Sequence, residues 1–161
     1  MKKNLSLTLL LLFFSLTGAE LLLKEGKNGL PENWKAYGKG TGVTRFEKGV
    51  LRIADQSASG EWGINRSVEV KNPGTYEFVV KADGKTSGAQ LVALTGKRVF
   101  SRRFPAVPTG AKEAVCTLRF TVPAGCRSVL LYIYGTYKGM PDTAGCFNFY
   151  PRVTCPLKSQ H

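Results

Sequence analysis

Residues 62–82 carry the clearest alternation of apolar and polar positions in the chain. The alternating apolar positions are Ile64, Val68, Val70, Tyr76, Phe78 and Val80. Between the two halves stands Asn72-Pro73-Gly74, in which proline fixes one backbone angle and glycine tolerates a positive one. A period of two places alternate side chains on opposite faces of a sheet. The segment therefore predicts two strands joined by a turn, with Arg66 in the same register as Ile64 and Val68.

The rest of the chain shows the same pattern of short strands separated by turn residues. Short strands are predicted at residues 43–46 and 50–54, joined as a hairpin through Gly49. Five more are predicted at 89–94, 99–104, 114–122, 128–134 and 146–153, and a first one begins within 20–27. No segment sustains the spacing of an amphipathic helix. About ten short strands with turn signals between them predict an all-β fold, a two-sheet antiparallel β-sandwich.

The first nineteen residues are expected to be a signal peptide. Lys2 and Lys3 precede an apolar run at 5–16, and the small residues Thr17-Gly18-Ala19 end it. The run is too short to span a bilayer, and no second run follows it. We therefore expect a secreted or periplasmic protein with no membrane association after signal cleavage, made of a β-sandwich domain at 20–155 and a flexible tail at 156–161.

The charge of the chain is strongly basic. Two of the 23 Lys and Arg residues, Lys2 and Lys3, belong to the expected signal peptide, so the remaining chain carries 21 against 11 acidic residues, a net charge of +10. Such a surface favours anionic partners, although scattered lysines also serve solubility. No helix-turn-helix or zinc-finger pattern points to nucleic acid. A polysaccharide or other glycan, in particular an acidic one, suits the expected compartment better.

Four cysteines, Cys116, Cys126, Cys146 and Cys155, lie in the last third of the chain. An oxidising compartment makes disulfides the default, and the absence of any C-x-x-C pair argues against zinc. We expect no metal and no cofactor. If successive strands alternate in direction, the pairs Cys116–Cys146 and Cys126–Cys155 each share one end of the sandwich, which a disulfide requires. The alternative is that Cys116 acts as a small buried apolar side chain.

Several short motifs resemble a known family. They are Leu30-Pro31-x-x-Trp34, Gly49-Val50-Leu51-Arg52-Ile53, Ile64-x-Arg66-x-Val68-x-Val70, Pro73-Gly74-x-Tyr76-x-Phe78, Phe120-x-Val122-Pro123 and Gly145-x-Phe147-x-Phe149. Together they resemble the galactose-binding-like jelly rolls, in particular the carbohydrate-binding modules of families 4, 9 and 22. The resemblance implies a jelly roll that binds glycans without catalysis. Tyr150-Pro151 stands where many such modules carry an aspartate pair, so the usual calcium ligand is missing, and Arg66 replaces a frequent glutamine.

The best candidates for sugar contacts are Tyr132 and Tyr134. Val129, Leu131 and Ile133 share one face of their strand, so the two tyrosines are expected to form an exposed pair on the other face. Flat aromatic faces cover the C–H face of a pyranose, and a few amide or guanidinium donors bind its hydroxyls.

Further candidates surround this pair. Tyr137 and Trp62 are expected to wall the surface, Gln90 and Asn65 to reach hydroxyls, and Arg66 to pair with a carboxylate. The alternatives are that the tyrosines pack beneath a loop and that Arg66 forms a structural ion pair. Trp34, directly after a turn, is expected to plug one end of the core.

Catalysis has little support in the sequence. The only histidine is His161 in the tail, and no two carboxylates are spaced to face one cleft. The leading hypothesis is an exported, non-catalytic protein, similar to a carbohydrate-binding module, that holds a glycan on an aromatic-lined sheet face. The alternative is a structural or protein-interaction β-sandwich domain of the envelope or extracellular space.

Overall fold

The computed structural model describes residues 25–38, 42–47, 50–55, 61–84, 89–106, 108–136 and 145–154. The expected signal peptide at 1–19 and the expected tail at 156–161 lie outside these ranges, so both stay predictions. None of the helices in the described ranges has the length and apolar composition needed to cross a membrane.

Strands dominate the described chain. A short 3-10 helix, η1 (Lys27–Gly29), precedes β1 (Lys35–Gly38), β2 (Val43–Glu47), β3 (Val50–Asp55), β4 (Trp62–Glu69), β5 (Gly74–Gly84), β6 (Gln90–Thr95), β7 (Arg98–Arg103), β8 (Ala114–Val122), β9 (Ser128–Thr136) and β10 (Gly145–Thr154).

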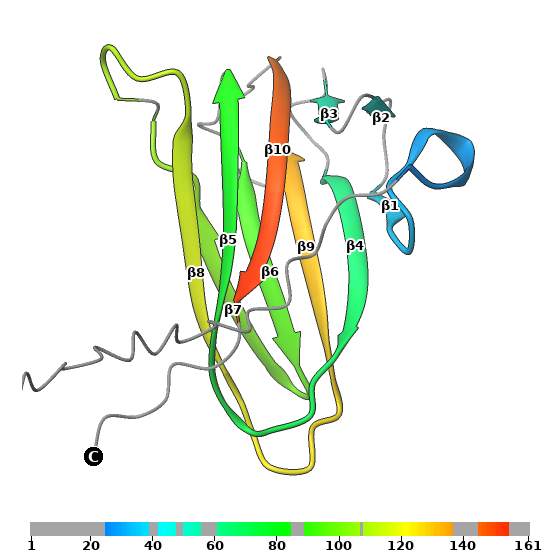
Figure 1. The fold of residues 1–161 in the computed structure, drawn as a ribbon, viewed down its shortest axis with the longest axis vertical. Helices are drawn as coiled ribbons and strands as arrows, with labels where there is room; N and C mark the ends of the chain where they lie inside the picture. The colour runs from blue at the N-terminus through cyan, green and yellow to red at the C-terminus, as the bar shows by residue number, and fades with distance from the viewer. Residues whose placement is uncertain are drawn as a thin grey trace, which may run out of the picture.

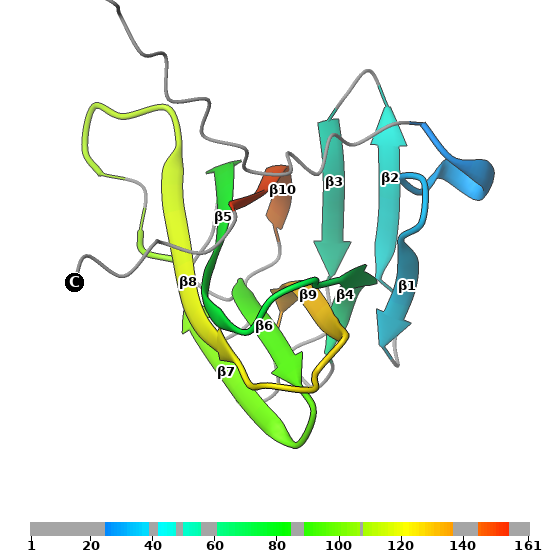
Figure 2. The same cartoon turned by 60° about the horizontal axis from the view of Figure 1, so that its bottom comes forward.

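These strands form two layers, which Figures 1 and 2 show from the side and from below. The first sheet has the order β1-β4-β9-β6-β7, and the second has the order β2-β3-β10-β5-β8. All the pairings between neighbouring strands are antiparallel. The predicted all-β, two-sheet antiparallel β-sandwich is confirmed.

The predicted strand within residues 20–27 is tested only at residues 25–27, because residues 20–24 lie outside the described ranges. Glu25 forms only an isolated bridge with Pro31, and the backbone N–H of Gly26 donates to the carbonyl of Leu30 at 3.0 Å. The chain therefore turns back on itself here, and the first described strand is β1. The predicted hairpin of β2 and β3 is confirmed, with Val43 opposite Ala54 and Glu47 opposite Val50.

The two strands of residues 62–82 form as predicted, but they do not pair with each other. β4 lies between β1 and β9 in the first sheet, whereas β5 lies between β10 and β8 in the second. The turn at Asn72-Pro73-Gly74 carries the chain from one sheet to the other. Because each strand has one apolar face, this crossing lets the apolar sets of both strands meet in the middle of the sandwich.

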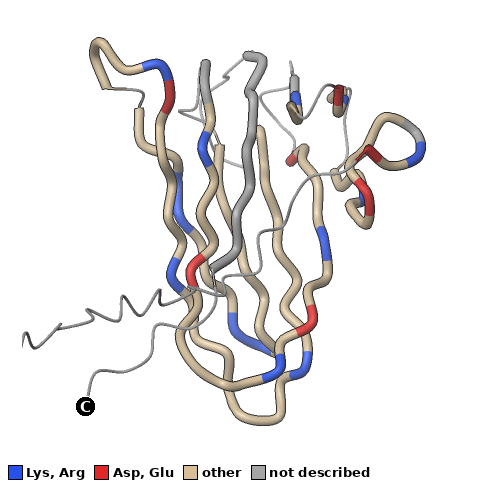
Figure 3. The backbone as a smooth tube through the Cα atoms, viewed as in Figure 1, with Lys and Arg blue, Asp and Glu red and all other residues tan. Residues whose placement is uncertain are grey.

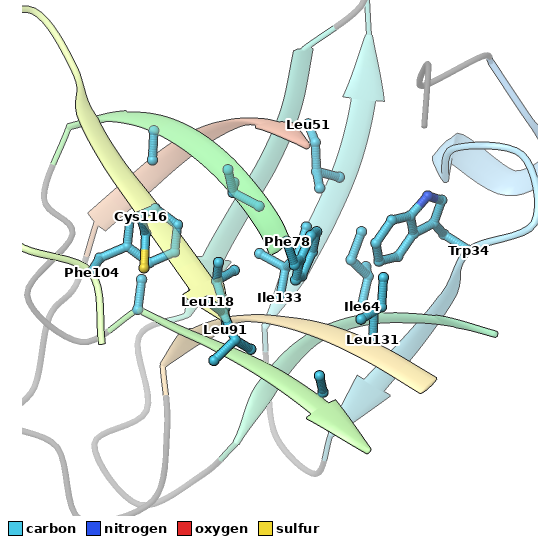
Figure 4. Close-up of a cluster of buried hydrophobic side chains, with 14 of the residues drawn as sticks. Trp34, Leu51, Ile64, Phe78, Leu91, Phe104, Cys116, Leu118, Leu131 and Ile133 are labelled. Atoms are coloured by element: carbon cyan, nitrogen blue, oxygen red, sulfur yellow. The ribbon is translucent and has the colours of Figure 1, made fainter. Parts of the chain in front are cut away.

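The core lies between the two sheets (Figure 4). Its fully buried side chains come from both layers: Leu51, Ile53, Phe78 and Val80 from the second sheet, and Ile64, Leu91, Leu131 and Ile133 from the first. Trp34 is only 4% exposed and packs in the same cluster beside Ile64. Trp34 is thus a core residue, as its position after the turn predicts.

The predicted Cys116–Cys146 disulfide does not form, because β5 separates the two strands. Cys116 on β8 lies opposite Val80, and Val80 lies opposite Pro151, five residues along β10 from Cys146. At about 3.3 Å per residue, that offset alone exceeds what a disulfide can bridge. Cys116 is a buried free thiol whose Sγ lies 3.5 Å from the carbonyl oxygen of Arg103.

The second predicted disulfide, Cys126–Cys155, is not tested, because Cys155 lies outside the described residues. Cys126 is partly buried and is a free thiol in the described chain. Its Sγ donates to the carbonyl oxygen of Ser128 at 3.1 Å. The alternative for Cys116, a small buried apolar side chain, agrees with its 1% exposure.

Candidate functional site

The central strand of the first sheet, β9, presents two different faces. Val129, Leu131 and Ile133 are buried in the core between the sheets. Tyr132 and Tyr134 alternate with them and belong to a second, separate apolar cluster that includes Val92. The period of two along β9 therefore places both tyrosines on the outer face of the first sheet, as predicted.

The two tyrosines stack on each other and are joined by Tyr37 from β1. The ring centroids of Tyr132 and Tyr134 are 5.5 Å apart with an interplanar angle of 1°. The ring of Tyr37 stands edge-on at 5.2 Å from Tyr132 and 5.9 Å from Tyr134. Offset-stacked and edge-to-face rings are both favourable arrangements. We call these three residues the tyrosine cluster.

The prediction that Tyr132 and Tyr134 are exposed is wrong. Tyr132 is 9% exposed and Tyr134 is 5% exposed, so both side chains are buried. Each ring covers a face of the other, and Tyr37 packs against both. Tyr37 itself is 41% exposed, so it supplies the accessible aromatic surface of the cluster. Burial raises the pKa of the Tyr132 hydroxyl, and the neighbouring Tyr37 adds to that rise.

Gly63 allows the backbone of β4 to approach that of β9 closely beside Tyr134. It lies in register between Tyr37 on β1 and Tyr134 on β9, next to a register shift between Trp62 and Gly63. A Cβ on Gly63 would clash with the carbonyl oxygen of Ile133 and lie 2.8 Å from the Cα of Tyr134. Glycine is common at such β-bulges, where backbones approach closely. The tyrosine cluster thus depends on a residue without a side chain.

Strand register places two rows of residues across the outer face of the first sheet. We call the two rows together the tyrosine face. The upper row is Tyr37, Gly63, Tyr134, Gln90 and Arg103, and the lower row is Lys35, Asn65, Tyr132, Val92 and Ser101. The rows bring Asn65 and Gln90 beside the tyrosines, which is the arrangement that the sequence predicts for these four residues. Asn65 is partly exposed and Gln90 is 7% exposed.

Trp62 and Arg66 do not join this face. The indole Nε1 of Trp62 donates to Thr44 Oγ1 at 3.0 Å, and its ring packs against the main core. Arg66 lies opposite Leu131 and shares its inward register. Within the described part of the chain, Arg66 Nε is buried without a hydrogen-bond partner and Arg66 forms no ion pair. Its ligand role stays a prediction. Tyr137 lies outside the described residues.

Sequence reasoning missed Tyr37, Lys35 and Arg103. The run Lys35 to Gly38 resembles a loop because three glycines lie within residues 38–42 and the strand has only four residues. One signal was present: Lys35 and Tyr37 alternate with Trp34 and Ala36, which is a period of two. Arg103 could not be found from the sequence, because its place opposite Gln90 depends on which strands pair.

The chemistry of the tyrosine face is that of binding. Its ten residues offer aromatic rings, amides, a hydroxyl and two cations, but no carboxylate. A general acid and base pair for glycoside hydrolysis therefore has no members there. Among the described residues, no three His, Cys, Asp or Glu side chains come together in a way that could hold a metal ion.

No protein-family model matches the sequence, and no curated protein matches it. Among solved structures, a family 4 carbohydrate-binding module has a TM-score of 0.52 at 14% identity, covering 75% of this chain and 85% of that chain. The enzymatically active domain of tailspike protein 4 from bacteriophage CBA120 has a TM-score of 0.54 at 12% identity, covering 76% of this chain. This chain spans only 19% of the tailspike domain.

A family 29 carbohydrate-binding module is a more distant neighbour, with a TM-score of 0.48 at 14% identity and with 83% of this chain and 89% of that chain covered. At 14% identity and a TM-score of 0.52, the likeness to the family 4 module establishes the fold. The expected resemblance to carbohydrate-binding modules is thus confirmed in its coarse form, with family 4 among the neighbours, while families 9 and 22 stay a prediction.

Proposed function

We propose that this protein binds a glycan on the tyrosine face and that it does so after export, without a catalytic step. The observation that carries the proposal is the tyrosine cluster, in which the accessible ring of Tyr37 rests on the stacked pair Tyr132 and Tyr134. A rigid aromatic surface with amides beside it is the combination that sugar recognition needs.

Each part of the face has a role in this proposal. Tyr37 covers the C–H face of one sugar ring, and Tyr132 and Tyr134 hold Tyr37 in place from below. Asn65, one strand over from Tyr132, donates to and accepts from sugar hydroxyls through its amide. Gln90 does the same beside Tyr134. The likeness to a family 4 carbohydrate-binding module supports a glycan as the ligand.

A glycan array followed by titration calorimetry tests the proposal. We expect Tyr37→Ala to weaken binding of the best array ligand about ten-fold or more, because truncating a central aromatic anchor typically costs about 2 kcal/mol. Val115→Ala is the matched control, since Val115 is 49% exposed on the second sheet. Unchanged affinity in Tyr37→Ala, with an unchanged melting temperature, would contradict the proposed site.

A structural or protein-interaction domain is the second candidate. The low exposure of Tyr132 and Tyr134 favours it, since a packed cluster also serves to stabilise the edge strand β1. The same Tyr37→Ala variant separates the two functions. A structural role predicts a lower melting temperature and an array with no ligand, whereas glycan binding predicts array ligands that this variant loses.

A further inference from the structure

We infer that the glycan held on the tyrosine face is anionic, and that Lys35 and Arg103 recognise its carboxylate or sulfate groups. This inference rests on the proposed function and adds the class of ligand. Lys35 lies on β1 and Arg103 on β7, which are the two edge strands of the first sheet. The aromatic centre of the face is therefore flanked by one cation on each side.

The spacing suits an extended ligand that crosses the strands. Neighbouring strands lie about 4.8 Å apart, so Arg103 is about 10 Å from Tyr134, two strands away, measured between backbones. Lys35 lies two strands from Tyr132 in the other direction. The ring of Tyr37, on the same edge strand as Lys35, reaches Tyr132 and Tyr134. A sugar chain that runs from Tyr37 across this pair therefore has Lys35 near one end and Arg103, two strands beyond Tyr134, at the other.

Both cations are available for a ligand. Lys35 and Arg103 are exposed, and neither forms an ion pair within the described residues. Some other basic residues differ in this respect, because Arg119 Nε lies 2.6 Å from Glu77 Oε1 and Lys81 Nζ lies 3.0 Å from Glu113 Oε1. The two cations of the tyrosine face therefore bind an incoming anion without first losing a protein partner.

The two rows of the tyrosine face contain no acidic residue. Within the described strands of the first sheet, one acidic residue, Glu69, is in register, and it lies opposite Ser128. A second acidic residue, the partly exposed Glu61, lies just before β4, with its backbone against Gly38 of β1. The Ser128 position is the one that can be measured along β9. That position is four residues along β9 from Tyr132, or about 13 Å. This distance exceeds the screening length of about 8 Å at physiological salt. The two rows of the tyrosine face thus contain two cations and no carboxylate, which is a local arrangement that the net charge does not specify.

Net charge alone would not locate a partner. Figure 3 shows Lys and Arg spread along strands of both sheets and in several turns. Arg102 makes the useful contrast, because it neighbours Arg103 but lies opposite Leu91, whose side chain is in the core between the sheets. Its side chain therefore belongs to the other side of β7. If the inference is correct, Arg103 and Arg102 differ in their effect although they carry the same charge.

Calorimetric titration of the full-length protein with matched oligosaccharides tests the inference. The first pair is hexagalacturonate and its methyl ester, and the second is a sulfated galactan hexamer and its desulfated form. We expect at least one charged member to bind about ten-fold or more tightly than its neutral counterpart at 0.15 M salt. Equal binding within both pairs would overturn the inference.

Variants then assign the preference to residues. We expect Arg103→Gln and Lys35→Gln each to weaken binding of the charged oligosaccharide about five-fold, and to leave binding of its neutral counterpart unchanged. Arg102→Gln is the matched control and should change neither. An equal loss in Arg102→Gln and Arg103→Gln would show attraction by bulk charge and overturn the assignment.

The two proposals fail in different ways. If neutral and charged oligosaccharides bind equally and Tyr37→Ala abolishes both, the proposed function stands and the anionic class is wrong. If none of the four oligosaccharides binds, the anionic class is again wrong, and the glycan array decides separately whether the proposed function survives.

Discussion

The described part of the sandwich contains two stacked aromatic pairs that are alike in exposure and different in place. Tyr76 and Phe120 lie 5.8 Å apart with an interplanar angle of 16°, and they are 6% and 2% exposed. Tyr132 and Tyr134 lie 5.5 Å apart at 1°, and they are 9% and 5% exposed. The first pair belongs to the core between the sheets, and the second lies on an outer face.

The surroundings separate the two pairs where exposure does not. The hydroxyl of Tyr76 donates to the carbonyl oxygen of Asn72 at 2.7 Å, so it ties the turn between the sheets to the core. The outer pair is overlain by Tyr37, which is 41% exposed. A tyrosine that is nearly inaccessible can therefore still belong to a binding surface, when it supports the ring that a ligand touches.

The largest expected effect separates the pairs by stability. Phe120→Ala should lower the free energy of unfolding by about 3 to 5 kcal/mol, because it leaves a cavity between two sheets. Tyr37→Ala should cost about 1 kcal/mol or less, because that ring is partly solvated and its removal opens the outer face to water. Urea denaturation monitored by circular dichroism measures both values. Equal losses would mean that the tyrosine cluster is a second core.

A smaller loss of stability is expected from a substitution at Gly63, which lies opposite Tyr134 of the outer pair. Gly63→Ala should destabilise the protein by about 1 to 3 kcal/mol, because the new methyl group meets the backbone of Ile133 and Tyr134. It should also weaken binding of the array ligand, because β4, which pairs with the strand of Tyr37, must move away from β9.

Ser67→Ala is the control for Gly63, since Ser67 is exposed on the same strand and the same face. Its free energy of unfolding should stay within about 0.5 kcal/mol of the unchanged protein. If Gly63→Ala binds as well as the unchanged protein, the close approach of β4 to β9 at Gly63 is not needed for the site.

The smallest effect concerns Cys116, a buried thiol on β8, which is the strand that also carries Phe120 of the core pair. Burial raises the pKa of the Cys116 thiol from 9.0 to about 11, although the charge of Arg102 opposes the rise. The unfolded chain therefore loses this proton at lower pH than the folded protein does. The contribution of Cys116 to stability is complete below pH 9 and is lost as the pH rises through 11.

Urea denaturation between pH 8 and 11 measures this contribution. One proton accounts for at most about 1.4 kcal/mol per pH unit, so Cys116→Val should flatten the alkaline fall in stability by up to that amount. Valine keeps an apolar side chain of similar size in the core. Identical slopes for the two proteins would contradict a buried, neutral thiol at position 116.

Much of the fold could be predicted because period-two alternation is a local property. The strand at Ala114–Val122 and the outward direction of Tyr132 and Tyr134 both follow from the order of apolar and polar residues. Pairing is not local. The sequence could not show that β4 and β5 belong to different sheets, or that β5 separates Cys116 from Cys146.

The candidate site could likewise be predicted from local alternation but not where it depends on strand pairing. Asn65 and Gln90 could be chosen because their strands were recognised, but their neighbours in the rows depend on register. Tyr37 was missed because a four-residue edge strand that ends at Gly38, with Gly40 and Gly42 after it, resembles a loop. Trp62 was chosen for its ring, and its hydrogen bond to Thr44 was not foreseeable from spacing.

The place of β10 within its sheet has a consequence for folding. This last described strand lies between β3 and β5, so residues 50–55 and 74–84 become neighbours only through residues 145–154. Two interior strand edges therefore stay unpaired until nearly the whole domain has been synthesised. Contacts between residues so distant in sequence form slowly, and open edges invite pairing with other chains. We expect the domain to fold late and all at once, with aggregation as the competing outcome.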